Sequence, residues 1–575
     1  MSPGLNFNTA NSLWGGVLVE TLVRSGVRHA VISPGSRSTP LTLAFAVHDG
    51  IEAIPVLDER SASFFALGLA KQHHAPVVLL CTSGTAGANY FPAVIEAQES
   101  GVPLVVITAD RPPEMRECAS GQTIDQQKLF GSHVNFYHEL AVPEATVASL
   151  AYLRQTLVHA CAVAFGSPGP VHLNAPFRDP LVPPPNGSGT GLDDACDWNL
   201  FFSHVTPPIA VEPWAQSPEV PLAVHGVIIA GPAQPDDPAE YAALVGTIAG
   251  KLGWPVLADG LSPLRNHRAG QINAVTSYDV LLRNPALAER LRPERVLCLG
   301  GWPISKVLRA WLAEADGPVL LVNEGESNRD ALHGKTQHLR CSLQAFAEQL
   351  PSATDPNGYA QMWPRLEQAA RDGLDDRLRA MTAMFEGRAA WLLAQHLPEN
   401  TPVFLANSMP VRDVEYFWPP SDRRTQLFFN RGANGIDGTL STAMGIAHGG
   451  RPAVLLTGDL ALLHDTNGFL LRTKFRGTLT IVLINNRGGG IFEHLPVASV
   501  DAFEEFFATP QSVDFRLLAE SYGAEYVLVR DWPEFVALVS TLPSTGVRVL
   551  EIRTDRKADA ALRKKMFAEI SASLK

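Results

Sequence analysis

The stretches RPAVLLTGD (451–459) and LTIVLINN (479–486) are runs of aliphatic residues that end in polar ones. Continuous Val/Ile/Leu runs of this kind are typical of strands buried on both faces, as in a parallel sheet covered by helices. Similar runs recur along the chain, separated by helix-length segments, and fall within residues 29–110, 226–325 and 401–553. This pattern predicts three α/β blocks with parallel sheets.

Proline-rich segments separate the blocks. The sequence DPLVPPPNGSG begins at residue 179, and LPSATDPNG spans 350–358. Proline at such density sustains neither a helix nor a central strand, so the first segment is predicted to be a surface linker. We predict three Rossmann-like α/β domains: an N-terminal domain over 1–183, a linker over 184–222, a central domain over 223–352 and a C-terminal domain over 353–575.

Composition excludes several classes of protein. A chain of 575 residues is too long for one core, and its net charge of −12 disfavours broad contact with nucleic acid. Its six cysteines form no CxxC pair, which argues against a zinc site or a disulfide framework and fits a reducing compartment. No signal peptide and no run of 18 apolar residues is present. We therefore expect a cytoplasmic protein with no membrane span.

Polar residues follow the two quoted runs directly. Gly458 and Asp459 end the first, and Asn485 and Asn486 end the second. Carboxylate and amide oxygens at the carboxyl ends of strands suit a hard cation such as Mg²⁺, which would bridge to a diphosphate. A glycine beside the carboxylate would let phosphate oxygens approach backbone N–H groups at a helix start. The alternative is that Asp459 caps a helix and the asparagines form a turn.

Together the two motifs resemble the thiamine diphosphate signature, in which Gly-Asp is followed, after a spacer of this length, by Asn-Asn. The resemblance implies that Asp459, Asn486 and the Gly488 carbonyl hold Mg²⁺, with Mn²⁺ as the alternative metal. It also implies a glutamate in another domain that protonates the aminopyrimidine ring. Glu59 in VLDERSASFFALGLA (56–70) is the candidate. The alternative is that Glu59 caps a helix or pairs with Arg60.

Longer segments resemble the 2-succinyl-5-enolpyruvyl-6-hydroxy-3-cyclohexene-1-carboxylate synthase family of menaquinone biosynthesis. Leu460 stands where most thiamine diphosphate enzymes have glycine, and it is the usual residue in this family. The resemblance is close in both outer blocks and loose in the middle one. The matching segments are SPGSRSTPLTLAFA (33–46), TSGTAGANYFPAVIEA (82–97), TADRPPEMRECASGQ (108–122), ANSMPVRDVEYF (406–417) and NRGANGIDGTLSTAMGIA (430–447).

The resemblance implies a transferase with the thiamine diphosphate-binding fold. Such enzymes decarboxylate 2-oxoglutarate to a carbanion that keeps a distal carboxylate, and add that unit to isochorismate. The N-terminal domain would bind the pyrimidine, the central domain no cofactor, and the C-terminal domain the diphosphate and metal. Active sites would lie at the subunit interface of a homodimer or homotetramer, where Glu59 of one subunit meets Asp459 of another.

Two other readings remain. The first is another thiamine diphosphate decarboxylase or carboligase, such as an acetohydroxyacid synthase, but these lack the SPGSRSTP stretch. The second is a non-catalytic binding protein of the same fold. The presence of Glu59, Asp459 and Asn486 argues against it.

The substrates carry several carboxylates, which need cationic partners. Four arginines are predicted at or just past strand ends, although each by itself would be an ordinary surface arginine. The sequence departs from relatives at Gly121, where asparagine is common, and at Val307, where some have arginine after the lysine. The resemblance assigns substrate contacts to Ser36, Arg37, Arg111, Gln122, Lys306, Ser408, Arg412, Arg431 and Leu495, and cofactor contacts to Glu59, Asn407, Ser408, Ile436, Gly458, Asp459, Leu460, Asn486 and Phe492.

Overall fold

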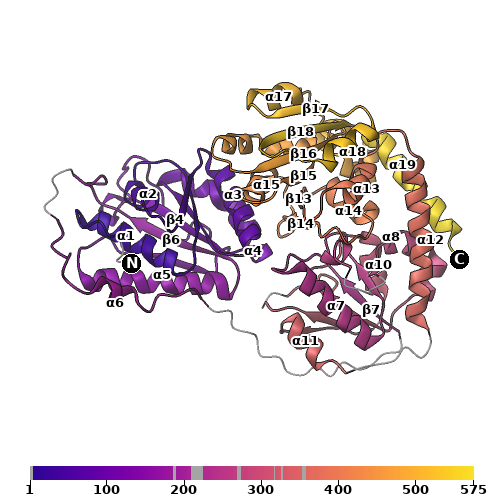
Figure 1. Cartoon of the computed structure of the whole chain (residues 1–575), viewed down its shortest axis with the longest axis horizontal. Helices are drawn as coiled ribbons and strands as arrows, with labels where there is room; N and C mark the ends of the chain where they lie inside the picture. The colour runs from indigo at the N-terminus through magenta and orange to yellow at the C-terminus, as the bar shows by residue number, and fades with distance from the viewer. Residues whose placement is uncertain are drawn as a thin grey trace. The chain divides into compact units, whose positions relative to one another are not determined.

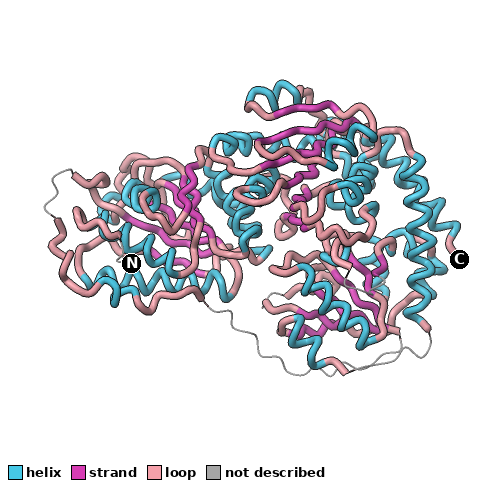
Figure 2. The backbone as a smooth tube through the Cα atoms, viewed as in Figure 1, coloured by secondary structure: helices cyan, strands magenta, loops and turns pink. Residues whose placement is uncertain are grey.

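The computed structural model describes residues 4–184, 189–208, 225–268, 274–315, 317–325, 328–351 and 358–575. It confirms the predicted fold class, because it contains three six-stranded sheets in which every strand pair is parallel. In Figure 2 the strands of the sheets lie among helices, as expected for α/β layers. The chain forms two compact units: Met1–Val211 with Asn430–Gly450 and Leu463–Gly477, and Glu212–Phe429 with Arg451–Leu462 and Thr478–Lys575.

The first sheet belongs to the first unit. Its strands are β1 (His29–Ile32), β2 (Glu52–Pro55), β3 (Val77–Cys81), β4 (Leu104–Asp110), β5 (Phe136–Glu139) and β6 (Pro170–Pro176). They run in the order β2-β1-β3-β4-β6-β5, so the strand order reverses between β1 and β3. Ligands of open α/β sheets bind at the carboxyl ends of strands beside such a reversal. The helices of this region are α1 (Ala10–Arg24), α2 (Thr39–Ala46), α3 (Glu59–His73), α4 (Phe91–Ser100), α5 (Val147–Gly166) and α6 (Trp198–Phe202).

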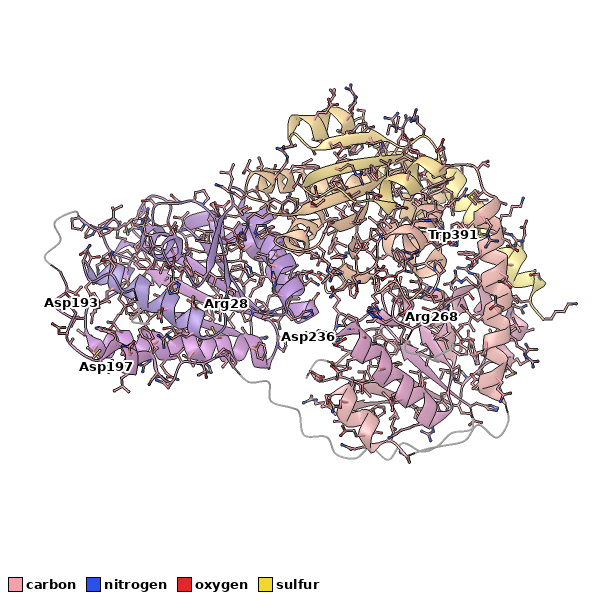
Figure 3. The ribbon with its side chains drawn as sticks, viewed as in Figure 1. Arg28, Asp193, Asp197, Asp236, Arg268 and Trp391 are labelled. Carbon is pink, nitrogen blue, oxygen red and sulfur yellow. The ribbon has the colours of Figure 1, made fainter. Side chains whose placement is uncertain are left out.

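Helix α6 lies within the stretch 184–222 that the sequence assigns to a linker. Asp197, labelled in Figure 3, caps it by accepting hydrogen bonds from the N–H groups of Asn199 and Leu200. Phe201 and Phe202 are buried in the core of the first sheet. Residues 185–188 and 209–224 of this region lie outside the described ones. The domain boundaries therefore stay a prediction.

The second sheet lies in the second unit. It is ordered β12-β11-β10-β7-β8-β9, from β7 (Gly226–Ala230), β8 (Val256–Ala258), β9 (Ala274–Val275), β10 (Arg295–Leu299), β11 (Val319–Val322) and β12 (Thr336–Leu339). Apolar side chains on both faces of its strands are buried under helices. Those helices are α7 (Pro238–Leu252), α8 (Tyr278–Leu282), α9 (Pro285–Arg290), α10 (Lys306–Glu314) and α11 (Leu343–Gln349).

The third sheet carries both motifs that opened the sequence analysis. Its strands are β13 (Pro402–Leu405), β14 (Gln426–Phe429), β15 (Ala453–Gly458), β16 (Thr478–Asn485), β17 (Glu525–Leu528) and β18 (Gly546–Arg553), in the order β14-β13-β15-β16-β18-β17 (Figure 1). The order reverses between β13 and β15, which places Gly458 and Asp459 beside the reversal. The remaining helices are α12 (Tyr359–Ala380), α13 (Glu386–His396), α14 (Met409–Phe417), α15 (Thr439–Ala447), α16 (Asp459–His464), α17 (Phe515–Ser521), α18 (Trp532–Ser540) and α19 (Arg556–Ser573).

Helices α3 and α15, both in the first unit, cross at two glycines. A β-carbon on Gly68 would lie 2.1 Å from the Thr442 carbonyl oxygen, and one on Gly445 would lie 2.2 Å from the Phe65 carbonyl oxygen. Real β-carbons do not approach other heavy atoms so closely. The two helix backbones are therefore in direct contact, and only glycine permits it.

We expect Gly68→Ala to destabilise the protein by about 1–3 kcal/mol, because the added methyl group must push the two helices apart. Gly250 in α7 is a matched control, since nothing lies within 4 Å of the position its β-carbon would take. Alanine there should leave stability unchanged or raise it by up to about 1 kcal/mol. Circular-dichroism melting curves measure both shifts. A Gly68→Ala protein that melts at or above the wild-type temperature would contradict the close crossing.

Candidate active site

Three loops meet at the carboxyl edge of the first sheet, after β1, β3 and β4. The backbone N–H of Arg37 donates to Thr82 Oγ1 (3.3 Å), and Arg111 Nη1 donates to Ser83 Oγ (3.3 Å). Gln122 Nε2 donates to the Ser83 carbonyl (3.0 Å), and Ser83 Oγ donates to the Gln122 carbonyl (2.9 Å). The structure thus brings together Arg37, Arg111 and Gln122, and Ser83, which the sequence analysis missed, links two of them.

Arg37 is nearly buried at 6% exposure. Its Nη1 donates to the Phe177 carbonyl (2.9 Å), and the exposed carboxylate of Asp179 lies 3.8 Å away. Burial, followed by the positive charge of Arg111, lowers the pKa of Arg37. Exposed Ser36 precedes it in the same loop. Two guanidinium groups held this close form a local positive site in a negatively charged chain, as anionic ligands require.

Glu59 is the first residue of α3. The preceding residue, Asp58, caps the helix by accepting a hydrogen bond from the Ser61 N–H (2.8 Å), so the alternative that Glu59 is the cap is wrong. Within the described part of the chain, the Glu59 carboxylate makes no hydrogen bond or ion pair, with Arg60 or any other residue. Burial raises the pKa of the nearby Cys81 thiol, and the negative charge of Glu59 raises it further.

The loop that carries Arg431 and Ile436 is anchored to the first unit. The buried Glu96 of α4 accepts hydrogen bonds from the Gly432 N–H (3.0 Å) and the Ala433 N–H (2.7 Å). Both Arg431 and Ile436 are half-buried. Sequence reasoning missed Glu96, for which the only signal is one carboxylate in the apolar segment AVIEA (93–97).

Asp459 begins α16 at the end of β15 and is 4% exposed. Its Oδ1 accepts from the Leu460 N–H (2.8 Å), and its Oδ2 accepts from the Gly488 N–H (2.9 Å). The second bond joins the two motifs across 29 residues of sequence. Burial raises the pKa of Asp459 to about 6, although these backbone N–H groups lower it. A bound cation would offset that burial penalty. Half-buried Gly458 precedes Asp459 and ends the strand.

The two asparagines play different parts. Asn485 makes a turn, since its Oδ1 accepts from the Arg487 N–H (3.3 Å), and its Nδ2 donates to Glu551 Oε1 (2.6 Å). The Nδ2 of Asn486 donates to Glu386 Oε2 (3.1 Å), but its buried Oδ1 has no partner within the described residues. A buried acceptor left without a donor is unfavourable unless a ligand fills the gap. The predicted turn alternative therefore describes Asn485 and not Asn486.

Gly488 follows in a conformation that requires glycine. Its φ is +131°, and a β-carbon there would lie 2.3 Å from the Ala508 carbonyl oxygen. The Gly488 carbonyl accepts one hydrogen bond, from the Gly490 N–H (2.9 Å), and keeps a second lone pair. The desolvated Asp459 carboxylate, the unpartnered Asn486 oxygen and this carbonyl form a donor set that fits a hard divalent cation.

The loop after β13 carries the next predicted group. Asn407 is buried, and half-buried Ser408 takes the strained φ of +74° at the start of α14. Arg412 donates from Nη1 to the Ser408 carbonyl. Arg412 lies within α14, which differs from the predicted place at a strand end, because the helix begins directly after the loop. Burial lowers the pKa of Arg412, and the charge of nearby Arg309 lowers it further.

Lys306 starts α10 and is exposed, and no described contact joins it to the other site residues. Arg309, three residues further along the same helix, is one of two cations whose charge lowers the pKa of Arg412, the other being Arg563. Arg309 was not predicted from the sequence, because a second cation was expected only at position 307, which is occupied by valine.

Phe492 and Leu495 lie after the glycine run, in and just past the 3₁₀ turn η5 (Gly490–His494). Both are half-buried, as is Leu460. The Phe492 ring packs edge-on against Phe507, with ring centroids 5.9 Å apart. Phe492 and Leu495 therefore follow Asn486 and Gly488 closely along the chain.

Within the described residues, no group of three His, Cys, Asp or Glu side chains could hold a metal ion. The donor set above is of another kind, with one carboxylate, one amide and one carbonyl. No described helix is long and apolar enough to cross a membrane.

Family models for thiamine pyrophosphate enzymes match this chain in three places. The N-terminal TPP binding domain matches residues 14–129, the middle domain residues 216–405, and the C-terminal TPP binding domain residues 412–552. The first match covers strands β1 to β4 of the first sheet, the second covers the whole second sheet and β13 of the third, and the third covers β14 to β18. The fold described above is that of this enzyme class.

Curated relatives narrow the assignment. Proteins of Microcystis aeruginosa, Trichodesmium erythraeum and Gloeothece citriformis are 52%, 50% and 50% identical, over 96%, 97% and 99% of this chain and 98%, 98% and 99% of their own lengths. All three are named 2-succinyl-5-enolpyruvyl-6-hydroxy-3-cyclohexene-1-carboxylate synthase. The chain belongs to this synthase family of thiamine pyrophosphate enzymes.

Proposed function

We propose that the protein is a thiamine diphosphate-dependent transferase of menaquinone biosynthesis. It releases CO₂ from 2-oxoglutarate and joins the remaining four-carbon unit to isochorismate, giving 2-succinyl-5-enolpyruvyl-6-hydroxy-3-cyclohexene-1-carboxylate. The observation that carries this proposal is the Asp459 carboxylate bonded to the Gly488 N–H beside the unpartnered oxygen of Asn486. The full-length relatives at about 50% identity support the choice of substrates.

In this proposal Asp459, Asn486 and the Gly488 carbonyl hold Mg²⁺, or Mn²⁺ in its place. Gly458, Leu460, Asn407 and Ser408 contact the cofactor around them. When bound, thiamine diphosphate supplies the electron sink that lets a 2-oxo acid lose CO₂. The protein residues bind and orient the substrates and exclude water from the site, and the Glu59 carboxylate transfers protons.

Glu59 moves the proton. Its carboxylate is unpartnered among the described residues and is therefore able to hydrogen-bond a ligand nitrogen and protonate it. We propose a homodimer, or a tetramer of such dimers, in which Glu59 of one protomer serves the cofactor held by the partner subunit's Asp459. Sedimentation at equilibrium tests this, since a monomer active at every concentration would contradict it.

Ile436, Phe492 and Leu495 are proposed as the apolar wall of the reaction space. Exclusion of water strengthens the electrostatic contacts inside a site and prevents loss of reactive species to hydrolysis. Such a wall matters here because the reacting carbon must meet isochorismate and not a proton from solvent.

The arginines are proposed to divide the substrates between them. Arg412 and Arg431, with Ser408, hold the distal carboxylate of 2-oxoglutarate. Arg37 and Arg111 hold the carboxylates of isochorismate. Ser36, Gln122, Lys306 and Leu495 add further substrate contacts.

We expect Arg412→Ala to weaken capture of 2-oxoglutarate by about one to two decades, because a charge-assisted hydrogen bond is worth roughly 1.5–3 kcal/mol. Arg37→Ala should leave CO₂ release nearly intact and block transfer to isochorismate. Single-turnover release of labelled CO₂ measures the first step, and formation of the isochorismate adduct, followed by mass spectrometry in the same turnover, measures the second.

Arg530→Ala is the control for this pair, since Arg530 is an exposed arginine that, among the described residues, pairs only with Glu534. It should change neither step. Equal loss of CO₂ release in Arg412→Ala and Arg37→Ala would contradict the division and indicate one shared anion site.

A product assay tests the proposed function as a whole. Incubation with 2-oxoglutarate and isochorismate should give the expected adduct by mass spectrometry. Pyruvate in place of 2-oxoglutarate should give little product. Efficient acetolactate formation would support an acetohydroxyacid synthase instead, and no CO₂ release from any 2-oxo acid would support a non-catalytic binding protein.

The cellular location is proposed to be the cytoplasm. All six cysteines are free, and those at 81, 161, 298 and 341 are buried. Free thiols are typical of a reducing compartment. Fractionation of cells that express a tagged chain tests the proposal, and recovery in an oxidising compartment would contradict it.

A further inference from the structure

A buried ion pair lies directly behind Asn486. Glu386, at the start of α13, accepts from Asn486 Nδ2 through its Oε2 (3.1 Å) and from Arg563 Nη2 through its Oε1 (2.8 Å). The three residues are 3–6% exposed. No part of the proposed reaction uses Glu386 or Arg563.

Arg563 is itself fixed from several sides. Its Nη2 also donates to Asp413 Oδ1 (2.5 Å), and its Nη1 lies 2.8 Å from Nε2 of His494. The guanidinium stacks over the rings of Phe385 and Phe417, 5.5 and 5.8 Å from their centroids. A cation held by two carboxylates and two rings has no freedom to release Glu386.

A second arginine of α19 holds the other side of the loop. Arg556 donates from Nη1 to the Arg487 carbonyl (3.1 Å) and from Nε to Glu493 Oε1 (2.9 Å). Two arginines on one helix therefore hold the segment 486–494 at both ends. At its start Arg563 acts on Asn486 through Glu386, and Arg556 contacts Arg487; at its end Arg556 contacts Glu493, and Arg563 contacts His494.

We infer that Glu386 and Arg563 are positioning residues, which orient the Asn486 amide so that its oxygen faces the metal. Helix α19, through Arg556 and Arg563, fixes the segment 486–494, which we call the metal loop. This inference rests on the proposed function, because it requires the metal site. Glu386 and Arg563 lie outside the donor set and determine its affinity for the metal.

The physical reason is the asymmetry of an amide. An asparagine presents NH₂ on one side and an oxygen on the other, and nothing in its own shape selects which faces the metal. A carboxylate can only accept hydrogen bonds, so Glu386 requires the NH₂ to face it. A reversed amide would place its oxygen against the Glu386 carboxylate and its NH₂ against the cation.

Glu386→Gln tests the inference because it keeps the shape of the side chain. Arg563 would hold the oxygen of the new amide, which leaves its NH₂ toward Asn486 and favours the reversed orientation. We expect Mn²⁺ affinity, measured by electron paramagnetic resonance with thiamine diphosphate present, to fall by about 10–100-fold, as for other groups that orient metal ligands.

Asn486→Asp separates positioning from mere structural support. A carboxylate presents an oxygen on both sides and needs no orienting group. In a chain that carries Asn486→Asp, adding Glu386→Gln should therefore change Mn²⁺ affinity by no more than about threefold. An equal loss in both backgrounds would overturn the inference and show that Glu386 serves only to neutralise Arg563.

Glu367 is a carboxylate that accepts from the Ser277 N–H (2.9 Å) and lies beside the buried Arg371, with no described contact to the metal loop. Glu367→Gln should leave Mn²⁺ affinity unchanged, and a loss equal to that of Glu386→Gln would overturn the inference.

Asp459→Ala distinguishes failure of this inference from failure of the proposed metal site. Unchanged Mn²⁺ affinity in Asp459→Ala would overturn both. Lost affinity in Asp459→Ala with full affinity in Glu386→Gln would overturn only the positioning role.

Discussion

The Asp459→Ala variant is expected to lose measurable binding of thiamine diphosphate in the presence of Mg²⁺. The substitution removes the one carboxylate of the proposed donor set and the hydrogen bond from the Gly488 N–H that joins the two loops. Without a cation to bridge them, the diphosphate would face the buried protein groups unneutralised. Titration calorimetry with cofactor and Mg²⁺ measures the loss directly.

A helix cap that is not part of the site provides the control. Asp531 caps α18 by accepting from the Glu534 N–H (2.8 Å). Asp531→Ala should lower stability by about 0.5–2 kcal/mol and leave cofactor binding intact. If Asp459→Ala behaves in the same way, with normal cofactor affinity, Asp459 is only a structural residue.

The second large effect is expected in the Glu59→Gln variant. Glutamine keeps the size and most hydrogen bonding of the side chain but can no longer exchange the proton. A general acid–base group contributes typically about 10²–10⁴-fold, and turnover should fall by that factor. Release of CO₂ from 2-oxoglutarate measures turnover, and calorimetry should show that the cofactor still binds, with moderately reduced affinity.

Asp58→Asn is the matched control, because asparagine caps helices about as well as aspartate. It should keep near-normal turnover, since Asp58 caps α3 and contributes no proton. Equal losses in the two variants would indicate that the start of α3 matters for structure, and would remove the acid–base role of Glu59.

Sequence patterns predicted the interior of the fold better than its margins. Strands such as β4, β10 and β16 are continuous aliphatic runs, and each was predicted. Strand β6 was not, although it lies inside the first sheet. It carries His172 and Asn174, which pair with Thr108 of the neighbouring strand at 2.8 and 2.9 Å. Polar side chains can be buried in a strand when they hydrogen-bond to a neighbouring strand, but the sequence of either strand alone does not reveal such a bond.

The edge strands were missed for a different reason. Strands β12, β14 and β17 have four residues each, and each is the outermost strand at one edge of its sheet. An edge strand has a neighbouring strand on one side only and is less fully buried, so it does not need a continuous aliphatic run.

For the site, the sequence identified residues whose chemistry is visible locally. Asp459 and Asn486 follow buried strands, and the structure joins their loops as expected. The sequence could not separate Asn485 from Asn486, because both are polar residues at one strand end. Their side-chain NH₂ groups donate to different carboxylates, Glu551 and Glu386, which lie 66 and 100 residues away along the chain.

The residues that support the site could not be predicted either, because their partners also lie far away along the chain. Glu96 and Arg563 look like ordinary helix residues in their own segments. Their roles depend on partners 336 and 177 residues distant, at Gly432 and Glu386 respectively.

The glycine crossing of α3 and α15 has a consequence for the order in which the chain can fold. The first unit takes its segments from Met1–Val211 and from Asn430–Gly450 and Leu463–Gly477. During synthesis α3 leaves the ribosome more than 350 residues before α15, and until then the groove around Gly68 has no partner. Long sequence separation between contacting segments slows folding and prolongs exposure of apolar surface. The N-terminal third should therefore depend on chaperones while the rest of the chain is made, and a fragment cut at the linker should aggregate.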